Sequence, residues 1–144
     1  MGYNDVPPPK KANWLMNAVL WVLQWFFGLY WVSIGVLHFI VPPGLPEAMS
    51  WMYDLSPALH VISGTLEILG GLGLLLPALT KRAVYLVPLA ALGLAGVMMA
   101  AMIWHIQHGT LLQTGPLNIV FAVILVFMAW GRWKLRPHVG RVAT

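Results

Sequence analysis

Four apolar segments dominate this chain of 144 residues, and each is long enough to cross a lipid bilayer. A bilayer core about 30 Å thick needs around 20 residues of helix. Because lipid offers no hydrogen-bonding partners, a spanning segment must satisfy its own backbone and therefore folds as a helix. We predict the spans at residues 14–41, 57–76, 83–106 and 116–131. The expected fold is an all-α membrane protein, a bundle of four transmembrane helices.

The few charged residues predict the orientation of this bundle. Charged residues make up 8% of the chain, whereas soluble domains carry about 25%. All eight Lys and Arg residues lie at segment ends, namely Lys10, Lys11, Lys81, Arg82, Arg132, Lys134, Arg136 and Arg141. The loops 42–56 and 107–115 carry none, so the positive-inside rule predicts cytoplasmic termini and two external loops. Charges placed in this way do not predict a nucleic-acid partner.

The transmembrane domain, residues 14–131, is flanked by two tails of different character. Residues 1–13 are predicted to form a polar, Pro-rich cytoplasmic tail, and residues 132–144 a basic cytoplasmic tail. The chain has no cysteine, which excludes disulfides, iron–sulfur clusters and thiol catalysis on it. Redox chemistry would therefore need a cofactor that is not covalently bound, or another subunit.

The first external loop predicts a short helix. Pro46 and Glu47 favour a helix start, and Met49, Met52 and Tyr53 would then share one face. A helix of this kind is expected to lie at the outer membrane surface as an interfacial helix. The alternative is an ordered loop that covers the bundle.

Glu67 is the one carboxylate inside the predicted spans, and no Lys or Arg shares those spans with it. A lone charge in lipid is costly, so such a residue predicts either a functional site or a neutral, hydrogen-bonded group that holds the bundle together. His60, Gly64, Glu67 and Gly71 follow the spacing of one helix face. This small, polar stripe predicts that a neighbouring helix approaches closely and that Glu67 points into the bundle.

Polar side chains gather at the predicted external end. They lie near the outer end of every span, at His38, His60, His105, His108 and Asn118. In the inner half, Gln24 is the one comparable polar group. A histidine at this depth can be only an interfacial polar residue, but four helices contribute to the group.

Three chemistries could use this group. A carboxyl and a histidine in an apolar cleft can hydrogen-bond the carbonyls of a quinone and pass protons. A haem b held between His60 and His105 is a second hypothesis. A copper or zinc site made by His38, His60, His105 and His108 is a third. Because no rigid ligand motif is present, we favour the quinone and expect no metal site.

Glu67, Gly70, Gly71 and Pro77 lie in the second span at fixed spacing. This pattern resembles the Glu-x-x-Gly-Gly…Leu-Leu-x-Pro motif of the DoxX-like family of small four-helix membrane proteins. The first span and the end of the third are similar to the family more loosely, so that the resemblance covers residues 20–130. It maps the family's acid onto Glu67 and its third-helix histidine onto His105.

Some DoxX-like and DoxD-like proteins are membrane subunits of thiosulfate:quinone oxidoreductases. The resemblance therefore implies a subunit of a quinone-linked oxidoreductase in the cytoplasmic (inner) membrane of a prokaryote. In this hypothesis Glu67 and His105 are catalytic, and Glu67 handles protons with His60 and His105 as its hydrogen-bonding partners. The residues expected to contact the quinone are His60, His38, Gly64 and Gly71. The expected partners are lipid and other membrane subunits or a soluble oxidoreductase.

The alternative hypothesis is a non-catalytic accessory subunit. Such a protein would pack against a larger respiratory or photosynthetic complex. The first span supplies a contact surface for this hypothesis, made of Trp14, Trp21, Trp25 and Trp31.

Overall fold

The computed structural model describes residues 12–139, and every regular element in that range is helical. In chain order the elements are α1 (Ala12–Ile40), η1 (Glu47–Asp54), α2 (Pro57–Thr80), α3 (Leu86–Gln107), α4 (Leu111–Trp130) and η2 (Gly131–Leu135). The predicted tail 1–13 lies outside the described residues except for its last two positions.

Four helices in the described range are long and apolar enough to cross a membrane. Large hydrophobic side chains are exposed along all four of them, as expected for faces that contact lipid rather than water. The predicted four-span, all-helical membrane protein is therefore confirmed. The cytoplasmic location of the termini stays a prediction.

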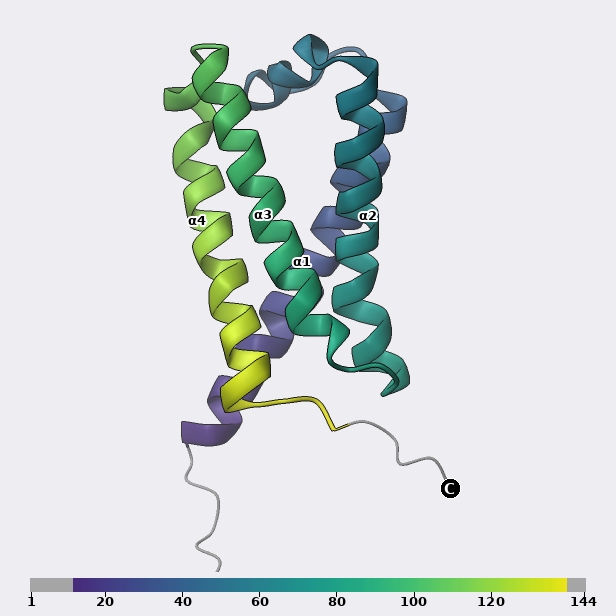
Figure 1. The fold of residues 1–144 in the computed structure, drawn as a ribbon, viewed down its shortest axis with the longest axis vertical. Coiled ribbons are helices and arrows are strands. Elements are labelled where there is room, and N and C mark those ends of the chain that lie inside the picture. The colour runs from purple at the N-terminus through teal and green to yellow at the C-terminus, as the bar shows by residue number, and fades with distance from the viewer. Residues whose placement is uncertain (1–11, 140–144) are drawn as a thin grey trace, which may run out of the picture.

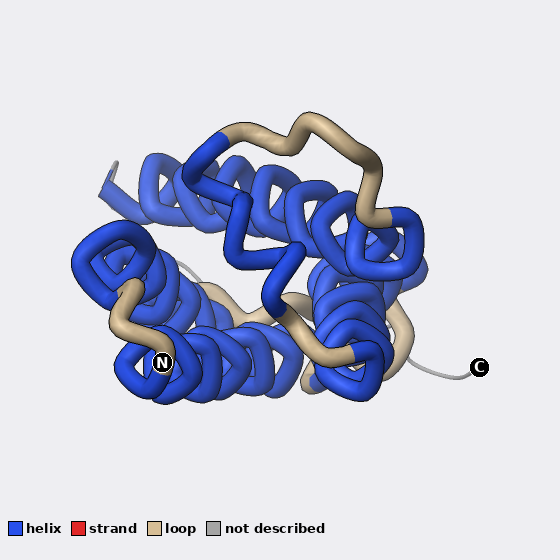
Figure 2. Tube along the Cα trace, turned by 90° about the horizontal axis from the view of Figure 1, so that it is seen from above, coloured by secondary structure: helices blue, strands red, loops and turns tan. Residues whose placement is uncertain are grey.

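The long helices form two antiparallel pairs, α1 with α2 and α3 with α4 (Figure 1). α2 and α3 are close at the end of the bundle where α1 begins and η2 lies, and they diverge toward the other end. We call the first the basic end, because Lys81, Arg82 and Lys134 lie there, and the second the histidine end. At the histidine end, η1 crosses over the middle of the bundle (Figure 2). A helix is thus present in the first external loop; its location at the membrane surface stays a prediction.

Gly35 and Gly64 set the close contact between α1 and α2. A Cβ atom added to Gly35 would lie 2.7 Å from the carbonyl oxygen of Gly64, and one added to Gly64 would lie 2.8 Å from that of Gly35. No side chain fits at such distances from backbone, so these glycines let the two helices touch. His38 and Glu67 each follow one of these glycines by three residues. The contact therefore fixes the rotation that turns both side chains toward each other.

Three helix ends differ from the sequence-based prediction by three or more residues. α3 begins at Leu86 instead of residue 83, and the other two differences involve proline. α2 continues through Pro77 to Thr80 and ends at Lys81, which has a left-handed φ of 56°. α4 begins at Leu111, so that Pro116 lies inside the helix instead of in its first turn. A proline removes only one backbone hydrogen bond, and near a helix end the remaining bonds of an apolar span outweigh this loss.

The basic end is held by polar contacts around Gln24, which is 1% exposed. Its Nε2 donates to the carbonyl oxygen of Leu74 at 2.6 Å, and its Oε1 accepts from Nε of Arg132 at 2.9 Å and from Nε2 of His138 at 3.0 Å. Nη1 of Arg132 donates to Oδ1 of Asn17 at 2.9 Å. Arg132 thus lies inside the bundle, although its position in the sequence suggests an exposed tail.

Candidate functional site

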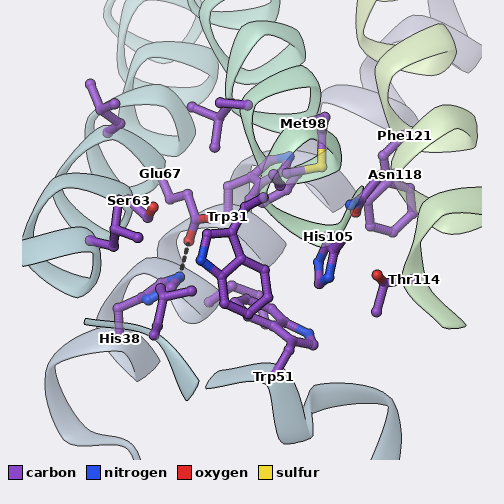
Figure 3. A pocket seen from close by; sticks show the side chains of 18 of the residues that line it. Trp31, His38, Trp51, Ser63, Glu67, Met98, His105, Thr114, Asn118 and Phe121 are labelled. Atoms are coloured by element: carbon purple, nitrogen blue, oxygen red, sulfur yellow. Dashed lines mark ion pairs between the residues drawn. The ribbon is translucent and has the colours of Figure 1, made fainter. Parts of the chain in front are cut away.

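A cavity of about 580 Å³ lies inside the histidine end. All four long helices and η1 contribute to its wall, which is mostly apolar. The polar groups on the wall are Tyr30, Trp31, His38, Trp51, Ser63, Glu67, Trp104, His105, Thr114 and Asn118, most of which are labelled in Figure 3. Leu66, Gly93 and Gly96 line the cavity where α2 and α3 diverge, and they are also exposed on the outer surface. The cavity therefore opens sideways toward lipid.

Glu67 and His38 form a buried pair on the wall of this cavity (Figure 3). Oε2 of Glu67 lies 3.4 Å from Nε2 of His38, and each residue is 3% exposed. The two atoms are not aligned as a hydrogen bond, and neither has another hydrogen-bonding partner within the protein. Both are therefore free to bond to a third group in the cavity.

His60 continues this pair toward the surface. Nδ1 of His60 lies 3.0 Å from Nδ1 of His38, and Nε2 of His60 lies 3.0 Å from the carbonyl oxygen of Met52 in η1. His38 and Glu67 are buried, whereas His60 is half-buried beneath η1. The three side chains thus form a chain of titratable groups that runs from the end of the bundle to the cavity.

The direction of each hydrogen bond follows from the Met52 carbonyl, which can only accept. Nε2 of His60 must therefore donate, and a neutral His60 then accepts at Nδ1 from the N–H of His38. A neutral His38 is left with a bare Nε2, which faces Glu67. Either Glu67 is protonated and His38 neutral, or Glu67 is a carboxylate and His38 an imidazolium. In both states the pair holds one shared proton and no net charge, as burial requires.

On the opposite wall, α3 and α4 contribute His105, Thr114 and Asn118. Nδ1 of His105 lies 2.8 Å from the hydroxyl of Thr110, so the imidazole is held in place. Nδ2 of Asn118 and Nε1 of Trp31 are buried and have no hydrogen-bonding partner within the protein. Two N–H donors thus line the same cavity as the Glu67–His38 pair, and buried donors of this kind are normally satisfied by a partner.

The contacts of the predicted site residues differ in part from those expected. The partner of Glu67 is His38, whereas His60 contacts His38, and His105 lies on the opposite wall beyond Trp51, whose ring centroid is 5.7 Å from that of His105. Trp51 itself was not among the predicted site residues. Trp51 lines the cavity because η1 crosses the bundle, and the sequence alone does not distinguish a tryptophan at the membrane surface from one that covers a cavity.

The residues of the predicted stripe on the second span do not all line the cavity. Glu67 faces the cavity, whereas Gly64 and Gly71 lie against the backbone of α1 and do not line the cavity. His108 is exposed, stacks on Trp104 with ring centroids 3.9 Å apart, and does not line the cavity. The stripe therefore positions the site more than it contacts a ligand.

Metal and haem binding find little support in this geometry. No group of three or more His, Asp or Glu residues that could hold a metal ion occurs among residues 12–139. Both ring nitrogens of His60 are engaged, with His38 and Met52. An axial haem ligand needs one nitrogen free.

Fold and site together define a four-helix membrane bundle with a buried acid–histidine pair in an internal, lipid-accessible cavity. The sequence profile of the DoxX-like family matches residues 22–128, and the chain belongs to that family. The resemblance seen in the second span is therefore confirmed. No curated protein and no solved structure matches the chain at a significant level.

Proposed function

We propose that this protein is the membrane subunit of a quinone-linked oxidoreductase and that the cavity at the histidine end binds the quinone. The observation that carries the proposal is the placement of the Glu67–His38 pair on the wall of a largely apolar cavity. Apolar walls with a few convergent polar groups are typical of sites for small lipophilic molecules. The opening between α2 and α3 suits a molecule that arrives from the membrane.

Two kinds of polar group would recognise a quinone ring here. The N–H groups of Trp31 and Asn118 lack partners in the protein, and carbonyl oxygens are the acceptors that they require. Glu67 and His38 lie across from Asn118, on the α1–α2 side of the cavity (Figure 3). A planar molecule with a carbonyl at each end could therefore bond to both walls.

The chemistry of the site follows from its one shared proton. A quinone takes up two electrons and two protons to become a quinol, and here the electrons would come from a partner oxidoreductase. Glu67 and His38 would supply one of these protons to the nearer oxygen, because their pair holds one and lies beside the cavity, and water would supply the second to the far oxygen. His60 would then return a proton to His38, which requires this hydrogen bond to reverse: a doubly protonated His60 donates from Nδ1, and His38 carries its own proton on Nε2.

Binding of a short-chain benzoquinone, decylubiquinone, tests the proposal on the protein in lipid nanodiscs. We expect Glu67→Gln to weaken binding about tenfold, through loss of a charge-assisted hydrogen bond. Glu47→Gln is the matched control, since Glu47 is an exposed carboxylate in η1 that does not line the cavity. Equal affinity of the wild type and Glu67→Gln would exclude a role for this carboxyl in binding. No binding by the wild type would exclude the proposal.

The accessory-subunit alternative makes a different prediction. The tryptophans of α1 do not form one surface, because Trp14 and Trp25 are exposed whereas Trp31 is buried. Only the exposed pair is available for a partner. Mass spectrometry of the complex purified in mild detergent separates the two hypotheses. A large respiratory or photosynthetic assembly in fixed ratio, released by Trp14→Ala with Trp25→Ala, would favour the accessory role.

A further inference from the structure

A second cavity, of about 340 Å³, lies at the basic end. Its wall is formed by the start of α3 on one side and by η2 and the segment after it on the other. The lining residues used below are Tyr85, Leu89, Arg132, Trp133 and His138. This cavity is separate from the candidate quinone site, since no residue lines both.

Arg132 places a positive charge in this wall without a matching negative charge. The side chain is 3% exposed, and its Nη2 atom is enclosed without a hydrogen-bonding partner. Gln24 and Asn17 accept from the other nitrogens but are neutral. Within residues 12–139 the one ion pair is His38–Glu67, at the opposite end of the bundle. A buried guanidinium without an anion is costly, so this charge favours an anionic ligand.

The other side chains around Arg132 do not provide that anion. Trp21 lies against the guanidinium, with its ring centroid 5.1 Å from Cζ, and contributes a cation–π contact. Burial, and after it the charge of Arg132, lower the pKa of His138 to about 4. His138 is therefore neutral at neutral pH and leaves Arg132 as the only cation on the cavity wall.

We propose that this cavity binds the phosphate of an anionic phospholipid headgroup, with Arg132 as the fixed counter-charge. A phosphate in the cavity lies against this side chain and compensates its charge, whether or not it bonds to Nη2 directly. Tyr85 and Trp133 are exposed at the rim, where aromatic residues meet the headgroup region of a bilayer. Basic pockets between transmembrane helices are a recognised place for anionic headgroups.

The surroundings favour a lipid over a phosphate free in water. Leu89 lines the cavity and is also exposed on the apolar flank of α3, so acyl chains can continue from the headgroup along the helix. Lys81, Arg82 and Lys134 are exposed at the same end and add to the positive potential. The described part of this end contains no Asp or Glu.

Native mass spectrometry of the full chain in detergent tests the site, with phosphatidylglycerol, phosphatidylcholine of the same acyl chains, and inorganic phosphate as probes. The wild type is expected to retain one phosphatidylglycerol in preference to phosphatidylcholine. Arg132→Gln should weaken this retention about tenfold. Lys134→Gln removes the same charge from an exposed position two residues away and should weaken it clearly less.

Arg132 also holds the helices together, so a second variant keeps its contacts intact. Leu89→Trp fills the cavity without touching the hydrogen bonds of Arg132, and it should displace the lipid equally well. Equal retention of the two lipids by the wild type would overturn the proposal. Equal losses in Arg132→Gln and Lys134→Gln would also overturn it and indicate surface attraction only. Displacement of phosphatidylglycerol by an equal concentration of inorganic phosphate would show a free-phosphate site instead.

The pKa of His138 gives a readout that a purely structural arginine would not move. A bound phosphate stabilises the imidazolium, so the pKa should rise from its value of about 4 when phosphatidylglycerol replaces phosphatidylcholine in the nanodisc. Nuclear magnetic resonance of His138 in the two lipids measures this change. An unchanged pKa would place the phosphate elsewhere and contradict the proposal.

Discussion

Gln24 and Glu67 lie at opposite ends of the bundle and are similarly buried, but their polar atoms differ in whether the protein supplies their partners. At the basic end, Gln24 uses both its amide nitrogen and its oxygen in contacts to α2, η2 and the segment after η2. At the histidine end, the polar atoms of Glu67, His38, Trp31 and Asn118 face a cavity, and each has an atom without a partner. Saturated polar groups rigidify a core, whereas unsatisfied ones indicate a place for a ligand.

Burial alone therefore does not identify a functional site in a membrane protein. Gln24 is buried as deeply as Glu67, yet its partners all belong to the protein. What distinguishes Glu67 is the open volume beside it. We therefore expect changes at Gln24 to act mainly on stability, and changes at Glu67 and the side chains beside it to act mainly on binding and proton transfer.

Gln24→Leu should have the largest effect on stability. The change removes the partner of the Leu74 carbonyl and of Arg132 Nε, and breaking a buried charged contact costs about 3–5 kcal/mol. Thermal unfolding in detergent measures the loss, and Gln113→Leu at an exposed position of α4 is the control. If Glu67→Gln were as destabilising as Gln24→Leu, the proposed contrast between the two ends would fail.

Gly64→Ala should have the next largest effect and lower the free energy of unfolding by about 2–3 kcal/mol. The reason is that the new Cβ atom would lie 2.8 Å from the carbonyl oxygen of Gly35. Gly93→Ala is the matched control. A Cβ atom there meets nothing within 4 Å, so the variant should be slightly more stable through its higher helix propensity. Equal destabilisation of the two variants would mean that α1 and α2 are not held by this glycine contact.

His60→Gln should lower the rate of proton uptake by a bound quinone about tenfold while leaving its affinity intact. Glutamine keeps a hydrogen bond to the Met52 carbonyl, but it cannot accept and release a proton. Stopped-flow measurement with a pH indicator follows the uptake, and His108→Gln, at an exposed histidine, is the control. Unchanged uptake in His60→Gln would exclude the proposed route through His38.

A smaller effect is expected on the pH dependence of stability, through His138 at the basic end. The pKa of His138 is about 4 in the folded protein, against 6.5 for an ordinary histidine, because of burial and the charge of Arg132. The unfolded chain therefore binds this proton more readily, and stability should fall as the pH drops from about 6.5 toward 4. Partial exposure limits the loss to about 1 kcal/mol. The free energy of unfolding should differ less between pH 7 and pH 4.5 in His138→Gln than in the wild type. The other ionisable groups around the cavity are Tyr85 and Arg132.

The sequence predicted the spans and the inward direction of Glu67, because both depend on periodicity within one segment. It did not predict that His38 is the partner of Glu67, because that pairing depends on how α1 and α2 are rotated against each other. The glycine spacing on both helices contained part of this information. Gly35 and Gly64 each precede a member of the pair by three residues, but two glycines in one sequence do not reveal that they touch.

The burial of Arg132 could not be predicted from the sequence either. The positive-inside rule places a basic residue at the correct end of a span but does not distinguish an exposed side chain from a buried one. Gln24 is the sequence feature that could have indicated this burial. A lone amide in the inner half of a span requires a partner at the same depth, and Arg132 is the charged donor at that depth.

The contact between Gln24 and Arg132 joins residues that are 108 positions apart in the sequence. A nascent chain can pair α1 with α2 through Gly35 and Gly64 while the third and fourth spans are still inside the ribosome. The hydrogen bond between Gln24 and Arg132, however, cannot form until the fourth span has been translated and released into the membrane. During biogenesis the α1–α2 hairpin can therefore keep the bond from Gln24 Nε2 to the Leu74 carbonyl, whereas Gln24 Oε1 has no partner until the last helix arrives.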